Sequence, residues 1–418
     1  MDTETLVYVE LGGEAMLLGR LWARTRKGRD SASFEYDDAW LEHPEHFALE
    51  PALKLGPGPF HTAADMPMFG AIGDSAPDRW GRALMRRAER RRAEQTGATP
   101  RSLREIDYLL MVNDEARQGA LRFALEDGGP FLATSETSPI PPLVDLPRLL
   151  SAAEHVGTES ASDEDLRLLL APGSSLGGAR PKASVRDQDG RLAIAKFPHK
   201  DDDYDEVRWE AVALSLAAKA GITVPEWRLV SVADKPVLLL HRFDRSGSVR
   251  IPFLSAMSML GARDRETRSY LEFADALRQH GASPKNDMRA IWRRIVFSVL
   301  ISNTDDHLRN HGFLYQGQEG WRLSPAYDLN PVPVDIKPRV LTTAIDTEDA
   351  MASLALALSV APYFELNEPD AHAIAAEVGH AVRCWREEAA RLGLATSQLE
   401  RMASAFEHED LRAAVTMA

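Results

Sequence analysis

The chain has 418 residues, 44% hydrophobic and 27% charged, so it is long enough for two or three domains and is neither a mini-protein, a fibrous repeat nor a wholly disordered chain. Its 49 Lys and Arg residues against 63 Asp and Glu give a net charge of −14, which disfavours DNA binding by this chain alone. The single cysteine excludes an internal disulfide and a thiolate zinc cluster, and suits a reducing compartment.

The N-terminal residues are acidic and lack the basic and apolar segments of a secretory signal. The most apolar runs, at 295–301 and 354–360, are much shorter than the roughly 20 residues that cross a bilayer. We therefore expect a cytoplasmic protein that does not contact a membrane.

The first predicted region, residues 1–126, begins with a small sheet. Two runs rich in β-formers, at 6–9 and 16–22, lie on either side of Gly12 and Gly13, a pattern that is typical of a β-hairpin. We expect this hairpin to start an N-terminal sheet.

A helix is predicted next, because Pro77 is placed for a first turn and Gly97 for a helix end. Its arginines reverse the acidic charge locally and leave nucleic-acid binding open as an alternative function. These arginines are Arg82, Arg86, Arg87, Arg90, Arg91 and Arg92. No aromatic side chain for base stacking is interleaved among them, so a solvent-facing or partner-facing helix is the simpler interpretation.

Residues 127–147 are predicted to be a linker, since they are rich in glycine and proline, which neither a helix nor a central strand tolerates well. Residues 148–250 follow as a mixed region, with a buried strand at 192–197 and a helix at 206–220. The last region, 251–418, has a mainly helical pattern.

A glycine-rich stretch covers residues 173–182, with the sequence GSSLGGARPK. Its glycines and small hydroxyl residues allow backbone N–H groups to approach a phosphate closely. The stretch matches no Walker A spacing, and a surface loop is the alternative interpretation.

Lys196 lies within the apolar run 192–197, where an unpaired ammonium group would be costly to bury and an anionic partner is needed. Glu210 lies on the next predicted helix. A strand lysine paired with a helix glutamate holds nucleotide phosphates in protein kinases. An edge-strand lysine that reaches solvent is the alternative.

The densest polar segment, residues 303–311, lies between apolar flanks. In phosphoryl transfer an aspartate aligns the attacking hydroxyl group, and an amide oxygen five positions later can bind Mg²⁺. Asp305 and Asn310 have this separation, and Asp328 follows a short predicted strand as a further hard oxygen ligand. The segment therefore predicts a magnesium-dependent phosphoryl-transfer site.

The same segment leaves a metal-dependent hydrolase open as an alternative. His307 and His311 stand at positions i and i+4, a spacing that would let them hold zinc on one helical face together with Asp305 or Asp306. Against this, no glutamate lies between the histidines as in the zincin motif.

Taken together and in order, these motifs resemble the HipA family of bacterial toxin serine/threonine kinases. The motifs are SLGGARPK at 175–182, AKFP at 195–198, HRFDR at 241–245, TDDHLRN at 304–310 and AYD at 326–328. The N-terminal region is similar as well, through FGAIGDSAPDRWG at 69–81 and GALRF at 119–123. Several motifs in a fixed order are far more specific than any one of them.

The resemblance implies an α+β, two-lobed, protein-kinase-like fold, with a mixed α/β N-terminal lobe and a mainly helical C-terminal lobe. It implies ATP and Mg²⁺ as cofactors and a HipB-like helix-turn-helix antitoxin, through which alone operator DNA would be bound. It further implies a protein substrate, an aminoacyl-tRNA synthetase being the example that family members provide. A nucleic-acid-binding or scaffold protein with a degenerate kinase fold is the alternative.

The resemblance also assigns roles to single residues. Asp305 would be the catalytic base, Asn310 and Asp328 the metal ligands, and Ser175 the autophosphorylation site. The residues expected to bind the nucleotide are Ser175, Gly177, Gly178, Ala179, Arg180, Lys182, Lys196, Glu210, His241, Arg242, Phe243, His307, Asn310, Tyr327 and Asp328. Two departures stand out: Asp306 replaces the glycine of the best-known family member, and Trp209 stands where an asparagine often precedes the helix glutamate.

Overall fold

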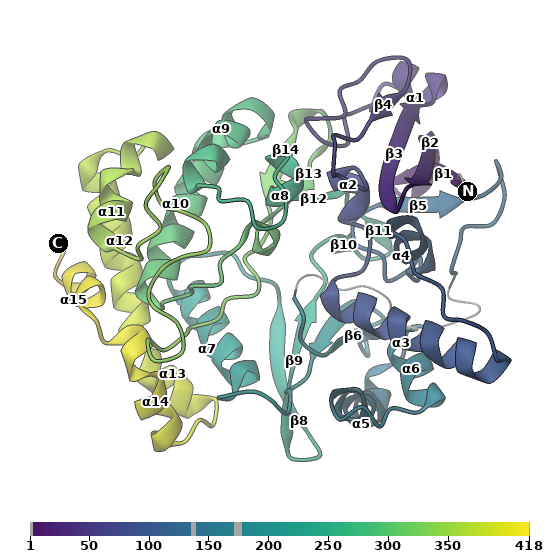
Figure 1. Ribbon diagram of the computed structural model, residues 1–418. Coiled ribbons are helices and arrows are strands. Elements are labelled where there is room, and N and C mark those ends of the chain that lie inside the picture. Colours follow the sequence, from purple (N-terminus) through teal and green to yellow (C-terminus); the bar gives the residue numbers. More distant parts are fainter. Residues whose placement is uncertain (1–2, 135–138, 171–177, 418) are drawn as a thin grey trace. The chain divides into compact units, whose positions relative to one another are not determined.

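The computed structural model describes residues 3–134, 139–170 and 178–417. The chain divides into two compact units, each built from two separate stretches of sequence (Figure 1). The N-terminal unit comprises Met1–Asp201 and Val230–Leu254, and the C-terminal unit comprises Asp202–Leu229 and Ser255–Ala418. The domain bounds at 126, 147 and 250 stay predictions.

The N-terminal unit begins with a five-stranded sheet of order β4-β3-β2-β1-β5. Its strands are β1 (Thr3–Leu11), β2 (Glu14–Arg26), β3 (Arg29–Tyr36), β4 (Phe60–His61) and β5 (Leu121–Ala124). β1 and β2 pair antiparallel up to Leu11 and Glu14. Gly12 and Gly13 both have positive φ in the two-residue turn, a backbone conformation that glycine adopts without strain. The predicted hairpin is therefore confirmed.

The helices of this unit are α1 (Asp38–Glu42), α2 (Gly70–Gly73), α3 (Arg79–Thr96), α4 (Glu105–Met111), α5 (Leu146–Gly157) and α6 (Asp163–Leu170), with a short 3₁₀ turn, η1 (Leu143–Asp145). The long helix α3 ends at Gly97 as predicted. It does not begin at Pro77, however, because the side chain of Asp78 accepts a hydrogen bond from the Gly81 N–H and caps the helix. Pro77 therefore lies outside the first turn.

A second sheet of order β6-β7-β9-β8 carries the predicted lysine strand. Its strands are β6 (Lys182–Arg186), β7 (Leu192–Lys196), β8 (Trp227–Val232) and β9 (Lys235–His241), and a small ribbon of β10 (Arg245–Ser246) and β11 (Val249–Arg250) follows. Apolar side chains of α3, α5 and α6 pack on this sheet and form one core. The register of β6 and β7 places Lys182 opposite Lys196.

Buried ion pairs connect two distant stretches of the N-terminal unit. The carboxylate of Asp244 has no exposed surface, and it contacts the guanidinium groups of Arg242 and Arg245. It also accepts a hydrogen bond of 2.7 Å from the Gly119 N–H. Burial alone would raise the pKa of Asp244, but the two neighbouring guanidinium groups hold it below its usual value. This cluster fastens the segment before β5 to the segment after β9.

The C-terminal unit is mainly helical, as predicted, and is drawn mostly from green to yellow in Figure 1. Its helices are α7 (Glu206–Lys219), α8 (Ala256–Met259), α9 (Tyr270–His280), α10 (Pro284–Leu300), α11 (Leu354–Ser359), α12 (Glu368–Val382), α13 (Trp385–Arg391), α14 (Thr396–Phe406) and α15 (Glu409–Thr416). The short strands β13 (Gly312–Tyr315) and β14 (Trp321–Leu323) form a hairpin. The remaining short elements are β12 (Phe253–Ser255), η2 (Leu308–Asn310), η3 (Gly317–Glu319) and η4 (Ala361–Phe364). Among the described residues, no helix is long and apolar enough to span a bilayer.

One buried acid gives the N-terminal unit an expected pH dependence. Glu50 accepts a hydrogen bond from the Ala71 N–H, and burial raises its pKa from 4.5 to about 7. Between these values the folded chain keeps a proton that the unfolded chain releases, so stability falls as the pH rises through this window. At about 1.4 kcal/mol per pH unit the loss is about 3 kcal/mol at most. Urea unfolding at about pH 5 and pH 8 should show a smaller pH effect for Glu50→Gln, and an unchanged pH effect would contradict this assignment.

Candidate active site

The predicted catalytic segment forms a tight loop after α10. Turns at 301–302 and 304–305 follow the helix, and η2 leads from this stretch into β13. The side chain of Asp305 is 67% exposed, and its carboxylate lies 3.7 Å from the ammonium group of Lys337. The Lys337 ammonium also donates to the Thr304 carbonyl at 3.1 Å. The loop thus presents an exposed carboxylate to solvent with a cation beside it.

Asn310 lies where a metal ligand is expected. Its side-chain N–H donates to the backbone carbonyl of Asp305 at 3.1 Å, which fixes the orientation of the amide group. Its side-chain oxygen is buried and has no hydrogen-bond partner among the described residues. A buried acceptor without a partner is costly, and amide oxygens are ligands that Mg²⁺ accepts. The amide oxygen of Asn310 therefore fits the role of one ligand of a divalent cation.

Asp328 belongs to a segment that is bonded to the same loop. The hydroxyl of Tyr327 donates to the Arg309 carbonyl at 2.8 Å, and the Asn330 N–H donates to the side-chain oxygen of Asn303 at 3.1 Å. Asp328 itself has a φ of +58°, a strained conformation for a residue other than glycine that is frequent at functional sites. The structure therefore brings the stretch around Asp328 to the loop that carries Asp305 and Asn310.

The two histidines of the loop do not share a helical face. His307 precedes η2 and His311 follows it, so the spacing that would place them together on an α-helix is not realised. His311 is buried, with its Nε2 2.9 Å from Asp306 Oδ1. Within the described ranges, no group of three or more His, Cys, Asp or Glu side chains could hold a metal ion. The helical zinc arrangement considered from sequence is therefore wrong.

Sequence reasoning missed the groups that surround Asp306. Its buried carboxylate accepts hydrogen bonds from the hydroxyls of Tyr270 and Ser298. Together with His311, these hydroxyl groups enclose the carboxylate of Asp306. From sequence, Asp306 stood out only as a departure from the family pattern. A buried acid needs partners, and that requirement was the one signal available from sequence.

In the N-terminal unit the two predicted phosphate lysines have different surroundings. Lys182 is buried, and its ammonium group pairs with Asp78 at 2.9 Å. Lys196, opposite it on β7, is half-buried. Gly178 has a φ of +87°, and a side-chain carbon there would lie 3.2 Å from the Lys182 ammonium, so this position favours glycine.

For two other residues of the predicted phosphate loop, the structure gives their exposure to solvent. Ala179 is exposed and Arg180 is partly exposed. Ser175 and Gly177 lie outside the described residues.

Three residues predicted to bind the nucleotide, His241, Arg242 and Phe243, lie at the end of β9 and directly after it. His241 lies at the end of this strand, with its Nε2 2.8 Å from Asp187 Oδ2. The Arg242 guanidinium is fully buried between Asp244 and the carbonyls of Ala116 and Arg117. The side chain of Arg242 thus has a structural role, and any contribution of this residue to nucleotide binding would come from its backbone. Phe243 is half-buried, with its ring 6.4 Å from that of Phe253.

Glu210 is buried on α7 of the C-terminal unit, while Lys196 belongs to the N-terminal unit. The pairing of these two residues stays a prediction. The preceding Trp209 is also buried and packs on Trp385 and Phe406, with ring centroids 6.1 and 6.0 Å apart. The side chain of Trp209 therefore belongs to the hydrophobic core of the helical unit.

The arginines of α3 are largely engaged within the protein. Arg82 forms a bidentate pair with Glu105 at 2.6 and 2.7 Å, and Arg91 donates to the Ala161 carbonyl at 2.9 Å. Arg92 pairs with Glu89 at 2.7 Å, and Arg87 donates to the Val156 carbonyl. Arg86 and Arg90 are exposed. Most arginines of this basic helix therefore form contacts within the N-terminal unit.

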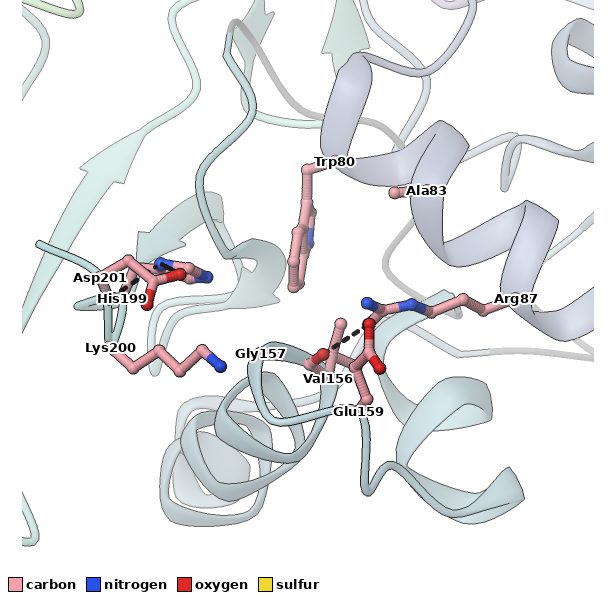
Figure 2. Close-up of a pocket in the computed structure, with 9 residues that line it drawn as sticks. All are labelled: Trp80, Ala83, Arg87, Val156, Gly157, Glu159, His199, Lys200 and Asp201. Atoms are coloured by element: carbon pink, nitrogen blue, oxygen red, sulfur yellow. Dashed lines mark hydrogen bonds and ion pairs between the residues drawn. The ribbon is translucent and has the colours of Figure 1, made fainter.

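A cavity of about 350 Å³ lies beside α3 (Figure 2). The indole of Trp80 projects into it between His199 and Arg87, and Lys200 lines it on the side away from α3. The Trp80 N–H donates to the Lys182 carbonyl at 3.0 Å, so the cavity wall is joined to the strand that carries Lys182. The predicted site residues that the structure describes do not line this cavity.

Comparison with solved structures defines the class of fold. The chain matches the HipA chain of a complex of HipA, HipB and operator DNA from Shewanella oneidensis MR-1, with a TM-score of 0.65 over 98% of this chain and 96% of that one. The sequences are 16% identical, so the match concerns the fold. The fold is thus the two-lobed, kinase-like fold of HipA, as predicted.

The chain belongs to the HipA-like C-terminal domain family, whose model matches residues 174–385, just over half of the chain. It is 26% identical over 337 residues to the "Putative kinase Y4mE" of Sinorhizobium fredii, with 73% of each chain covered. It is 27% identical over 199 residues to a "Putative kinase" of Haemophilus influenzae. This match covers 41% of the present chain and 56% of the relative. The predicted family is therefore confirmed.

Proposed function

We propose that the chain is an ATP-dependent serine/threonine protein kinase and the toxin of a type II toxin–antitoxin system. The observation that carries the proposal is the loop 303–310, in which an exposed Asp305 is followed by an Asn310 whose buried amide oxygen has no hydrogen-bond partner in the part of the chain that the structure describes. Membership of the HipA-like family supports it, and so do the relatives named as kinases.

In this proposal Asp305 accepts the proton of a substrate hydroxyl as the hydroxyl oxygen attacks the γ-phosphorus of ATP and the bond to the β-phosphate bridging oxygen breaks. Asn310 and Asp328 would hold Mg²⁺, which would neutralise charge on the phosphates. Lys182, Lys196 and the backbone of the glycine-rich loop bind the phosphates, and Glu210 orients Lys196. His241 and Phe243 line the adenine site, with His307 and Tyr327 completing the nucleotide site.

The direct test is incubation of the purified chain with radiolabelled ATP and Mg²⁺, with and without host lysate. Label is expected in a lysate protein, with an aminoacyl-tRNA synthetase as the first candidate. Label is also expected in the chain itself, mapped by mass spectrometry to Ser175. Phosphoamino-acid analysis should find phosphoserine or phosphothreonine. Absence of label from every protein would contradict the proposal.

The partner is proposed to be a HipB-like helix-turn-helix antitoxin. Support comes from the Shewanella oneidensis structure, in which HipA, HipB and operator DNA form one complex. The net charge of −14 opposes the phosphate backbone, so operator DNA is bound only through the antitoxin complex.

Removing the Lys196 ammonium or the Asp328 carboxylate is expected to weaken binding of Mg·ATP, because the first variant loses a charge-assisted contact and the second a metal ligand. Thermal-shift titration measures this directly, since stabilisation grows with the ratio of ligand concentration to Kd. Lys196→Ala and Asp328→Ala should both show a smaller shift than wild type. Lys235→Ala is the control, since Lys235 lies on β9 of the same sheet in an exposed pair with Glu154. Thermal shifts equal to that of the wild type in both test variants would refute the proposed Mg·ATP site.

A further inference from the structure

The carboxylate of Asp306 is the most enclosed charge of the loop 303–311. Its Oδ2 accepts hydrogen bonds from the hydroxyls of Tyr270 and Ser298, the latter at 3.0 Å, and its Oδ1 lies 2.9 Å from His311 Nε2. Its backbone carbonyl accepts from the Thr343 hydroxyl at 2.7 Å. Each carboxylate oxygen of Asp306, and its backbone carbonyl, thus lies against a polar partner.

These partners come from separate parts of the C-terminal unit. Tyr270 begins α9, Ser298 lies in the last turns of α10, and His311 directly precedes β13. The His311 ring is itself held edge-on by Tyr270 and Phe273, with ring centroids 5.8 and 5.2 Å away. The cluster of Tyr270, Ser298, Asp306 and His311, here called the Asp306 anchor, therefore ties Asp306 to the end of the loop and to the helices α9 and α10.

The neighbouring Asp305 has the opposite environment. Its side chain is largely exposed, and its ion-pair partner among the described residues, Lys337, lies 3.7 Å away and is itself 41% exposed. An exposed pair of this length contributes little to orientation. The position of Asp305 is therefore set by its backbone, which the Asp306 anchor holds on one side and the Asn310 amide, donating to the Asp305 carbonyl, holds on the other.

We propose that the Asp306 anchor positions Asp305 for proton acceptance, and that Tyr270, Ser298 and His311 act as positioning residues without touching substrate. This inference rests on the proposed kinase function. A displacement of about 1 Å at a reacting group can lower a rate by about 100-fold. Loosening the anchor should therefore lower kcat while leaving nucleotide binding unchanged.

The test is Tyr270→Phe, which removes one hydroxyl and keeps the ring against His311. We expect kcat to fall by about 10-fold or more, with KM for ATP within about twofold of wild type. Hydrogen exchange of the backbone amides at 303–311 should become faster. The matched control is Tyr36→Phe in the N-terminal unit, since Tyr36 is equally buried and its hydroxyl donates to the Leu53 carbonyl at 2.8 Å. This control should change neither kcat nor exchange at 303–311.

The outcomes separate the anchor from the kinase function. A kcat within twofold of wild type in Tyr270→Phe would overturn the positioning role, and so would an equal loss in Tyr36→Phe. If the wild-type chain transfers no phosphoryl group at all, the proposed function fails, and the exchange measurement still tests the anchor: unchanged exchange at 303–311 would refute it. Ser298→Ala repeats both measurements if Tyr270→Phe does not fold.

Discussion

Asp305→Asn is expected to lower the rate of phosphoryl transfer by about 10² to 10⁴-fold, the usual contribution of a general base. The amide cannot accept the proton of the attacking hydroxyl, but its volume is nearly unchanged. Because Asn310, Asp328 and the lysines remain in place, Mg·ATP should stabilise the variant against heat as it stabilises the wild type. Radiolabel transfer and thermal shift measure the two properties side by side.

The matched control is Asp275→Asn on α9. Asp275 is 68% exposed, against 67% for Asp305, and it too has a nearby basic partner, Arg278. This variant should keep the full transfer rate. A rate for Asp305→Asn within threefold of wild type, about 0.7 kcal/mol on the barrier, would show that Asp305 is not the base.

Asp244→Asn is expected to lower the free energy of unfolding of the N-terminal unit by about 3 to 5 kcal/mol. The carboxylate is fully buried between Arg242 and Arg245 and also accepts from the Gly119 N–H. An amide in its place leaves two buried guanidinium groups without their counter-ion, and that uncompensated charge is the source of the loss. Urea unfolding followed by tryptophan fluorescence measures it.

The control for this change is Asp189→Asn, which breaks an exposed pair with Arg191 in the same unit. Exposed pairs contribute at most about 1 kcal/mol, so the midpoint should hardly move. Equal losses in the two variants would show that the buried pairs do not stabilise this unit more than a surface pair.

The local part of the candidate site could be predicted from sequence, because its determinants are close along the chain. The separation of Asp305 and Asn310 is five residues, and the structure joins the two through the Asn310 N–H and the Asp305 carbonyl. The end of α3 at Gly97 and the turn at Gly12 and Gly13 were predictable for the same reason, since backbone conformation there depends on the glycine itself.

What could not be predicted depends on contacts between distant residues. Asp78 pairs with Lys182 across 104 positions, and Tyr270 reaches Asp306 across 36; no spacing rule connects them. The zinc site considered for His307 and His311 was wrong for a different reason. A spacing of i and i+4 predicts a shared face only in an α-helix, whereas the backbone between His307 and His311 forms a single 3₁₀ turn.

The pair of Asp78 and Lys182 has a consequence for where this protein can be divided. The HipA-like family model begins at residue 174, yet the ammonium group of Lys182 is neutralised by Asp78, and its carbonyl accepts from the Trp80 N–H. A fragment cut at the start of the family match would leave two lysines side by side on β6 and β7, one of them stripped of its counter-charge. Asp78 and Trp80 therefore supply contacts that β6 needs at Lys182, and the bounds of the family match do not enclose an electrostatically complete segment.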